Sequence, residues 1–234
     1  MTAVPLATGV WRIPTKPYDL INSFLFEDED GSLTLVDAGL RGGHNKVLAA
    51  LLELGKNPGD VTRILLTHAH SDHAGGLARI VQATGAKVHS HDREATYLRD
   101  GRPPMVDSST AGGRLMMRLP GKNFAKVEVA ETFADGAVLP IAGGLTVVHT
   151  PGHSPGHCSY LHTGSGVLIT GDAIFNLRGL RYAPSMTCTD IRQSRASAAH
   201  LGELDFEVAA FTHGTQVSNG ARQAVRAFLA GRTS

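Results

Sequence analysis

The residues with the clearest chemical potential lie in one short segment, Thr-His-Ala-His-Ser-Asp-His-Ala-Gly-Gly at 67–76. It follows a run of aliphatic residues that is typical of a buried strand. Because side chains alternate along an extended chain, His68 and His70 should point to the same side and bind one cation. Asp72 and His73 come where the two glycines turn the chain into a helix, so they should face a second cation. The spacing predicts a metal site with room for two ions.

Three later segments repeat the pattern of an apolar run followed by one candidate ligand. The ligands are His153, Asp172 and His213, which follow the runs 145–150, 167–170 and 208–212. One histidine or aspartate at the end of a strand is usually a hydrogen-bonded structural residue. Four such segments in one chain, in this order, instead indicate a shared metal centre.

This order resembles the metallo-β-lactamase superfamily, with His-x-His-x-Asp-His, then a Gly-His turn, then Gly-Asp and a final His. The resemblance spans residues 37–213 and implies an α/β fold, the αββα sandwich of that family. Carried over by position, it also implies the ligands. They are His68, His70 and His153 for the first metal, Asp72, His73 and His213 for the second, and Asp172 as a bridge between the two.

Two more residues of the pattern are implied to support the ligands. Asp37, in Leu-Val-Asp-Ala-Gly, matches an early motif whose carboxylate braces the metal loop. An aspartate that merely ends a strand would occupy the same place, so we expect a supporting role and not a catalytic one. His157 belongs to the turn Thr-Pro-Gly-His-Ser-Pro-Gly-His but not to the ligand set, and we expect it to hydrogen-bond to the centre.

The implied centre predicts hydrolysis. Two divalent cations lower the pKa of a shared water to about 7, so a bridging hydroxide becomes available as the nucleophile at neutral pH. Zinc is the expected metal, with iron or manganese as alternatives. Asp72 is the predicted catalytic residue, because it can ligate through one carboxylate oxygen and shuttle a proton with the other.

Differences between this sequence and individual branches of the family restrict the class of substrate that we expect. The β-lactamases that resemble this chain carry Cys or Ser where it has Asp172, or Cys in place of His73. Homoserine-lactone lactonases share the ligand set but usually have Tyr where this chain has Phe175. Glyoxalase II-like thioesterases share Gly-Asp-x-x-Phe but carry a helical C-terminal domain, for which the 21 residues after His213 leave no room. We expect a hydrolase of a small ester, lactone or thioester.

Two alternatives use the same ligand set. In persulfide dioxygenases it holds a single iron, which would make the protein an oxidoreductase. RNA-processing nucleases share the motif, but the formal charge of +1, from 22 basic and 21 acidic residues, predicts no nucleic-acid partner. The expected partner is a small-molecule substrate.

Length and composition predict one globular domain over 1–234, with 42% hydrophobic residues. No apolar run reaches the length of a membrane span, and the N-terminus lacks the pattern of a signal peptide. The only cysteines, Cys158 and Cys188, match no ligand position and fit a reducing compartment. We therefore expect a cytoplasmic protein without a membrane partner.

Strands and helices that could position these loops alternate twice along the chain. The predicted strands are 10–13, 22–26, 33–36, 63–67, 86–89, 127–129, 137–139, 145–149, 158–162 and 167–170. The predicted helices are 47–54, 77–84, 93–99, 190–201 and 219–229. Strands followed by helices, twice over, are what an αββα sandwich requires, with the ligand loops at one rim of the sheets.

The segment 100–126 is the least regular, because prolines and glycines surround two leucines and three methionines. It is predicted to be an insertion that covers the site, although a surface loop anchored to the core would look the same. Met116 and Phe175 are candidates for the substrate pocket. Arg178 is a third, because it could recognise a substrate carboxylate.

Overall fold

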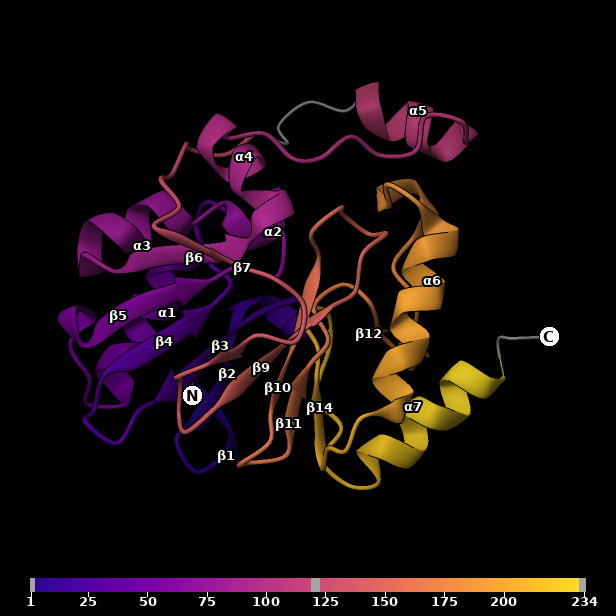
Figure 1. Ribbon diagram of the computed structural model, residues 1–234. Coiled ribbons are helices and arrows are strands. Elements are labelled where there is room, and N and C mark those ends of the chain that lie inside the picture. Colours follow the sequence, from indigo (N-terminus) through magenta and orange to yellow (C-terminus); the bar gives the residue numbers. More distant parts are fainter. Residues whose placement is uncertain (1–2, 119–122, 232–234) are drawn as a thin grey trace.

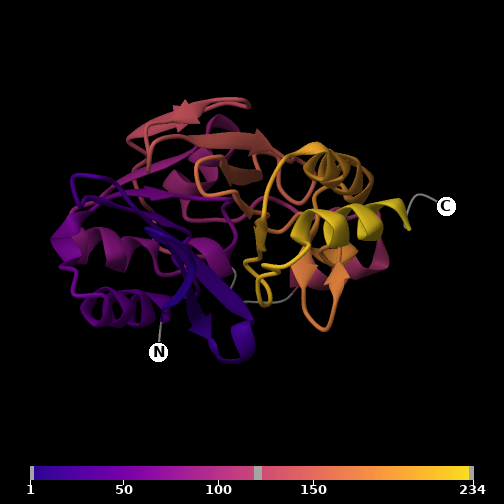
Figure 2. The same cartoon turned by 90° about the horizontal axis from the view of Figure 1, so that it is seen from below.

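The computed structural model describes residues 3–118 and 123–231. Two β-sheets pack face to face between two groups of helices, as Figure 1 shows. The view from below in Figure 2 separates the same helices to either side of the sheets. The predicted αββα sandwich is confirmed.

The first sheet has seven strands in chain order. They are β1 (Val4–Ala7), β2 (Val10–Lys16), β3 (Ile21–Glu27), β4 (Leu33–Val36), β5 (Val61–Leu65), β6 (Lys87–His91) and β7 (Glu131–Phe133). Hairpins make β1 to β4 antiparallel, whereas β4 to β7 are parallel. Parallel neighbours need a crossover, which helices supply. These helices are α1 (Gly43–Glu53), α2 (Ser71–Ala74), α3 (Leu77–Thr84) and α4 (Asp92–Asp100).

The second sheet has the order β14-β11-β10-β9-β8. Its strands are β8 (Val138–Leu139), β9 (Leu145–His149), β10 (Cys158–His162), β11 (Val167–Ile169) and β14 (Val208–Ala210). Helices α6 (Ile191–His200) and α7 (Ala221–Ala230) cover its outer face, and the hairpin of β12 (Phe175–Asn176) and β13 (Leu180–Arg181) follows β11. In the described ranges, short 3₁₀ turns lie at Pro17–Asp19, Pro58–Asp60, Ser185–Thr187 and Leu201–Glu203.

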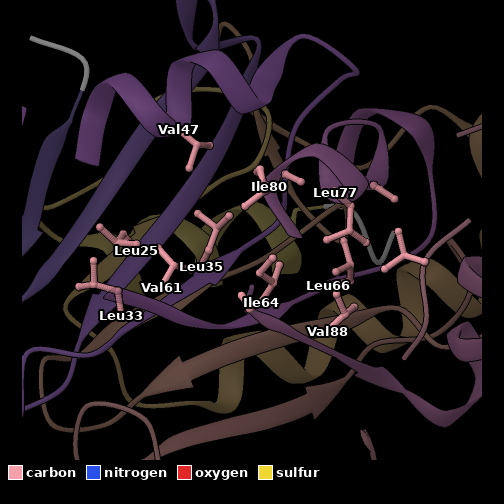
Figure 3. Close-up of a cluster of buried hydrophobic side chains, with 14 of the residues drawn as sticks. Leu25, Leu33, Leu35, Val47, Val61, Ile64, Leu66, Leu77, Ile80 and Val88 are labelled. Atoms are coloured by element: carbon pink, nitrogen blue, oxygen red, sulfur yellow. The ribbon is translucent and has the colours of Figure 1, made fainter. Parts of the chain in front are cut away.

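Alternation along the strands divides the core into three layers. In β3, Leu25 packs outward against α1, while Phe24 packs inward against the second sheet. In β11, Ile169 packs inward and Leu168 outward against α6 and α7. Figure 3 shows the outer layer of the first sheet, in which Val47 of α1 meets strand residues.

The topology brings the ligand loops to one rim. β9, β11 and β14 run in the same direction, because β10 is antiparallel to β9 and β11, and β11 is parallel to β14. Their carboxyl ends therefore meet at one edge, as expected where parallel strands end together. The loop after β5 reaches the same place from the first sheet, where Thr67 O accepts a 2.9 Å hydrogen bond from Cys158 N.

Two local predictions are wrong. The predicted strand 127–129 does not form, because Val127 N donates to Leu98 O at the end of α4 and not to a neighbouring strand; β7 begins at Glu131. The segment 100–126 also contains more regular structure than its prolines and glycines suggest, namely helix α5 (Ala111–Arg118), which begins where Thr110 Oγ1 accepts a bond from Gly113 N. Residues 119–122 of that segment lie outside the described residues.

No helix in 3–118 or 123–231 combines the length and the apolar character that crossing a membrane would require.

Candidate metal centre

The seven predicted ligands come together at the rim. Their ligand atoms form three groups, each with its atoms within 4.8 Å of one another. The groups are His68 with His70 and His153, Asp72 with His73 and His213, and His68 with His73 and Asp172. The structure thus brings together all seven residues that the sequence pattern predicts as metal ligands.

The first group consists of three imidazoles whose nitrogens face one another. His68 Nε2 lies 2.9 Å from His70 Nδ1, and His153 Nε2 lies 2.9 Å from the same atom. Burial lowers the pKa of His68 well below its ordinary value and that of His70 to about 3, which favours the neutral form of both rings. Burial acts in the same direction on His153, but the charge of Asp172 raises its pKa to about 9. Neutral imidazole is the form that binds a cation.

Asp172 lies between this group and the second one. Its Oδ2 is 3.2 Å from His153 Nε2, while its Oδ1 is 3.2 Å from His73 Nε2 and 3.3 Å from His213 Nε2. Asp72 Oδ2 completes the second group at 3.4 Å from His213 Nε2. The two oxygens of one carboxylate therefore face two different sets of ligands, which is what a bridging ligand requires.

Two atoms at this point are buried without a hydrogen-bond partner, His73 Nε2 and Asp172 Oδ1. Leaving a buried polar atom unsatisfied costs about 1–3 kcal/mol, so such atoms call for a ligand. Burial would raise the pKa of Asp172, but the charges of His213 and the neighbouring histidines hold it well below its ordinary value. An ionised, unpartnered carboxylate oxygen among imidazoles fits a divalent cation.

Asp37 braces the metal loop as the sequence suggested. Its Oδ1 accepts a 2.9 Å bond from Thr67 N, and its Oδ2 accepts bonds from Thr67 Oγ1 at 2.8 Å and from His73 Nδ1 at 2.7 Å. The left-handed backbone of Asp37, with φ of 61°, aims the carboxylate into the loop. The donation from Nδ1 leaves His73 Nε2 free for a ligand.

His157 lies behind the bridging residue. Its Nε2 accepts a 2.8 Å bond from Asp172 N, so its Nδ1 carries the proton and donates to Thr150 Oγ1 at 2.8 Å. Thr150 Oγ1 and Ser159 Oγ, 3.1 Å apart, continue the chain to Thr170 O. Burial and the charge of His153 keep the pKa of His157 well below its ordinary value, in agreement with this neutral tautomer. His157 therefore fixes the backbone of Asp172.

A second support was not predicted. His213 Nδ1 donates to Leu20 O at 2.6 Å, and Asn22 Nδ2 donates to Gly214 O at 2.8 Å. The guanidinium of Arg12 in turn donates to Asn22 Oδ1 at 2.8 Å. Nearly two hundred residues of sequence separate the partners, so their spacing carried no signal. A polar asparagine inside the apolar run of β3 was the available clue, because a buried amide needs partners.

A cavity of about 880 Å³ opens from the centre. Asp72, His70, His153, Asp172 and His213 lie at its metal end. Its apolar walls are formed by Ile21, Leu40, Pro103, Pro104, Met105, Val106, Met116, Met117, Phe175 and Pro184. The ring centroid of Phe175 lies 4.3 Å from that of His213, so Phe175 connects the walls to the ligands.

Arg178 does not share this position. It is exposed in the short turn between β12 and β13, with a left-handed φ of 58°, and it does not line the cavity. The tight turn directs this residue to solvent. The prediction that Arg178 recognises a substrate carboxylate therefore loses its structural basis, whereas Phe175 and Met116 both lie where the pocket was predicted.

Comparison with known proteins gives the family. A sequence model of the "Metallo-beta-lactamase superfamily" matches residues 18–213. The uncharacterized protein YobT of Bacillus subtilis is 35% identical over 73% of this chain and 69% of its own length. The probable metallo-hydrolase YybB of the same organism is 27% identical over 84% of this chain and 82% of its own. A hydroxyacylglutathione hydrolase of Cereibacter sphaeroides is 30% identical over 76% of this chain and 58% of its own.

The solved structures show the same relationship. The metallo-beta-lactamase family protein TTHA1429 from Thermus thermophilus superposes with a TM-score of 0.72 at 27% identity, over 97% of this chain and 80% of that protein. The order of the ligand loops, the two-sheet sandwich and the family match agree with one another. The chain belongs to the metallo-β-lactamase superfamily and is a metal-dependent hydrolase.

Proposed function

We propose that this protein is a binuclear hydrolase of a small ester, lactone or thioester, with zinc as the first choice of metal. The observation that carries the proposal is the carboxylate of Asp172, whose two oxygens face different ligand groups and one of which is buried without a hydrogen-bond partner. A single cation at either group would leave the other side of this carboxylate unused.

The two ligand groups would each hold one cation, and Asp172 would contact both. His68, His70 and His153 would hold one cation, Asp72, His73 and His213 the other, and Asp172 both. When bound, the pair would supply an acidified water and a Lewis acid for the substrate carbonyl.

Asp72 is the proposed proton shuttle. It lines the cavity, and although burial opposes its charge, its contacts with His213 and His73 keep its pKa below the ordinary value. An ionised carboxylate at the metal end of the cavity can take a proton from the attacking water and return it to the leaving group.

The cavity walls support substrates with an apolar acyl group. Among its described lining residues, Arg102 is the only lysine or arginine, and it already pairs with Asp100 at 3.1 Å. A glutathione thioester, the class of substrate in the name of the Cereibacter relative, carries two carboxylates that this wall would match poorly. We therefore propose acyl lactones and simple thioesters or aryl esters above glutathione thioesters and β-lactams.

Two measurements on the purified protein test the proposal. Elemental analysis should find about two zinc or similar ions per chain, as expected for two ligand sets joined by a carboxylate. A panel of an acyl lactone, an aryl ester, S-lactoylglutathione and a β-lactam should then show turnover of the first two above the others. One iron per chain, with oxygen uptake on a persulfide, would overturn the hydrolase proposal in favour of a dioxygenase.

A further inference from the structure

Glu94 is a fully buried carboxylate with no part in the ligand set. It lies in the first turn of α4, where a glutamate ordinarily interacts with the free N–H groups of its own helix. Here its oxygens accept bonds from two other loops instead. Oε2 accepts from Ala69 N at 2.8 Å, and Oε1 accepts from Ser154 Oγ and Gly156 N at 2.7 Å each.

These two loops carry the first ligand group. Ala69 lies between His68 and His70, whereas Ser154 directly follows His153. One carboxylate therefore joins the segments that would hold the first metal from its two sides, across sequence separations of 25 and 60 residues.

Within this group, His153 depends on its backbone more than the histidines of the second group do. His73 Nδ1 and His213 Nδ1 lie 2.7 Å and 2.6 Å from strong oxygen acceptors. His153 Nδ1, by contrast, faces only the sulfur of Cys188 at 3.6 Å, which is a weak partner. The place of His153 is consequently set by the loop that bears it.

Close packing against α4 fixes the position of the loop that contains Gly156. A Cβ added at Gly156 would lie 2.9 Å from Glu94 Cγ and 3.0 Å from Glu94 N, closer than packed atoms tolerate. The glycine lets the loop approach until its N–H reaches the carboxylate. Steric contact and three hydrogen bonds thus specify the same position.

We infer that Glu94 is a positioning residue that sets the distance between the loops bearing His68, His70 and His153, and thereby the affinity of the first metal. The inference rests on the proposed binuclear centre. It predicts that loss of the carboxylate weakens one of two bound metals while the other remains.

The variant Glu94→Gln tests this with nearly the same volume. In either orientation of the amide, its NH2 group would face a backbone N–H, that of Ala69 or of Gly156, so one loop is released. Competition with a chelator should show one of the two zinc ions bound about ten- to a hundredfold more weakly, the usual effect of losing a partner behind the ligands. NMR of ¹⁵N-labelled histidine should show changes at His70 and His153 and little change at His73 and His213.

Two further variants make the test decisive. Ser154→Ala removes one of the three donors and should weaken the same ion by a smaller factor, which gives a result even if Glu94→Gln does not fold. Val225→Ala, in the buried face of α7, should lower the melting temperature without changing either metal affinity. If Glu94→Gln weakens both ions equally, or neither, the inference fails. If the unaltered protein does not bind two metals, it is the proposed function that fails.

Discussion

Asp172 and Met116 both line the cavity, but they are held in very different ways. Asp172 is 3% exposed, its N–H is bound by His157, and three histidines surround its carboxylate. Met116 is partly buried on α5, beside Leu115 and Met117, which are 57% and 45% exposed. Asp172, at the metal end of the cavity, is buried and hydrogen-bonded, whereas the part of the wall that α5 supplies is more exposed.

Residues 101–118 form most of the apolar wall and are called the covering segment; their hydrogen bonds show the same contrast. Most are local, such as Ser109 N to Asp107 Oδ1 and Arg114 Nη1 to Ser109 O. One connection to the second sheet's side of the molecule runs from Asp107 N to Cys188 O at 2.9 Å. A segment with few buried contacts can change without disturbing the core. Chemistry and substrate choice should therefore respond to different substitutions.

The largest effect is expected for Asp172→Asn. The change removes the charge that both ligand groups share, so metal content should fall and turnover should drop by about a thousandfold, more than the 10- to 100-fold typical of partners behind the ligands. Elemental analysis and ester hydrolysis measure both.

His157→Gln is the matched control for that variant. It disturbs the hydrogen bonds to Asp172 N and Thr150 Oγ1 but removes no ligand, so it should lose less metal and less activity. Equal losses in the two variants would show that Asp172 does not bridge.

An intermediate effect is expected for Asp72→Asn. The amide can still ligate through its oxygen but cannot accept a proton, so kcat should fall by about a hundredfold or more while the fold and at least one metal remain. Circular dichroism, metal analysis and kinetics are the measurements. Normal turnover at normal metal content would reduce Asp72 to a ligand.

Much of the metal end was predictable because local patterns determine it. The strand before the histidines and the helix after the glycines form as predicted, although β5 ends at Leu65 and Asp72 and His73 already lie in α2, before the glycines. The three later ligands each follow a strand of the second sheet. Periodicity and turn residues are local quantities, and a sequence displays them directly.

The features that could not be predicted from the sequence depend on contacts between distant segments. Glu94 has the spacing of an ordinary exposed helix residue, and only the fold places it between two ligand loops. The turn that carries Arg178 to solvent is likewise a tertiary result, since a short hairpin fixes its direction. At 127–129, an alternating apolar pattern suggested a strand, but Val127 packs beneath α4 instead. An apolar pattern indicates burial, but it does not distinguish a strand from a buried irregular segment.

The smallest effect is expected for Met116→Ala, and it concerns only the covering wall. Because each buried methylene contributes about 0.8 kcal/mol, efficiency on aryl esters should rise with acyl length in the unaltered protein. Removing the half-buried thioether should cost about 1 kcal/mol, about fivefold in kcat/KM, on the longest chain and almost nothing on an acetyl ester. Metal content should not change.

Leu115→Ala provides the control for this last experiment, since Leu115 is on the same helix, 57% exposed, and does not line the cavity. It should leave the dependence on chain length intact, so that the two variants separate a cavity wall from a helix surface. If both flatten the dependence equally, the effect comes from the stability of α5. If neither does and acyl length has no influence, the covering segment does not bind the substrate, and the contrast between the two ends of the cavity would have no bearing on substrate choice.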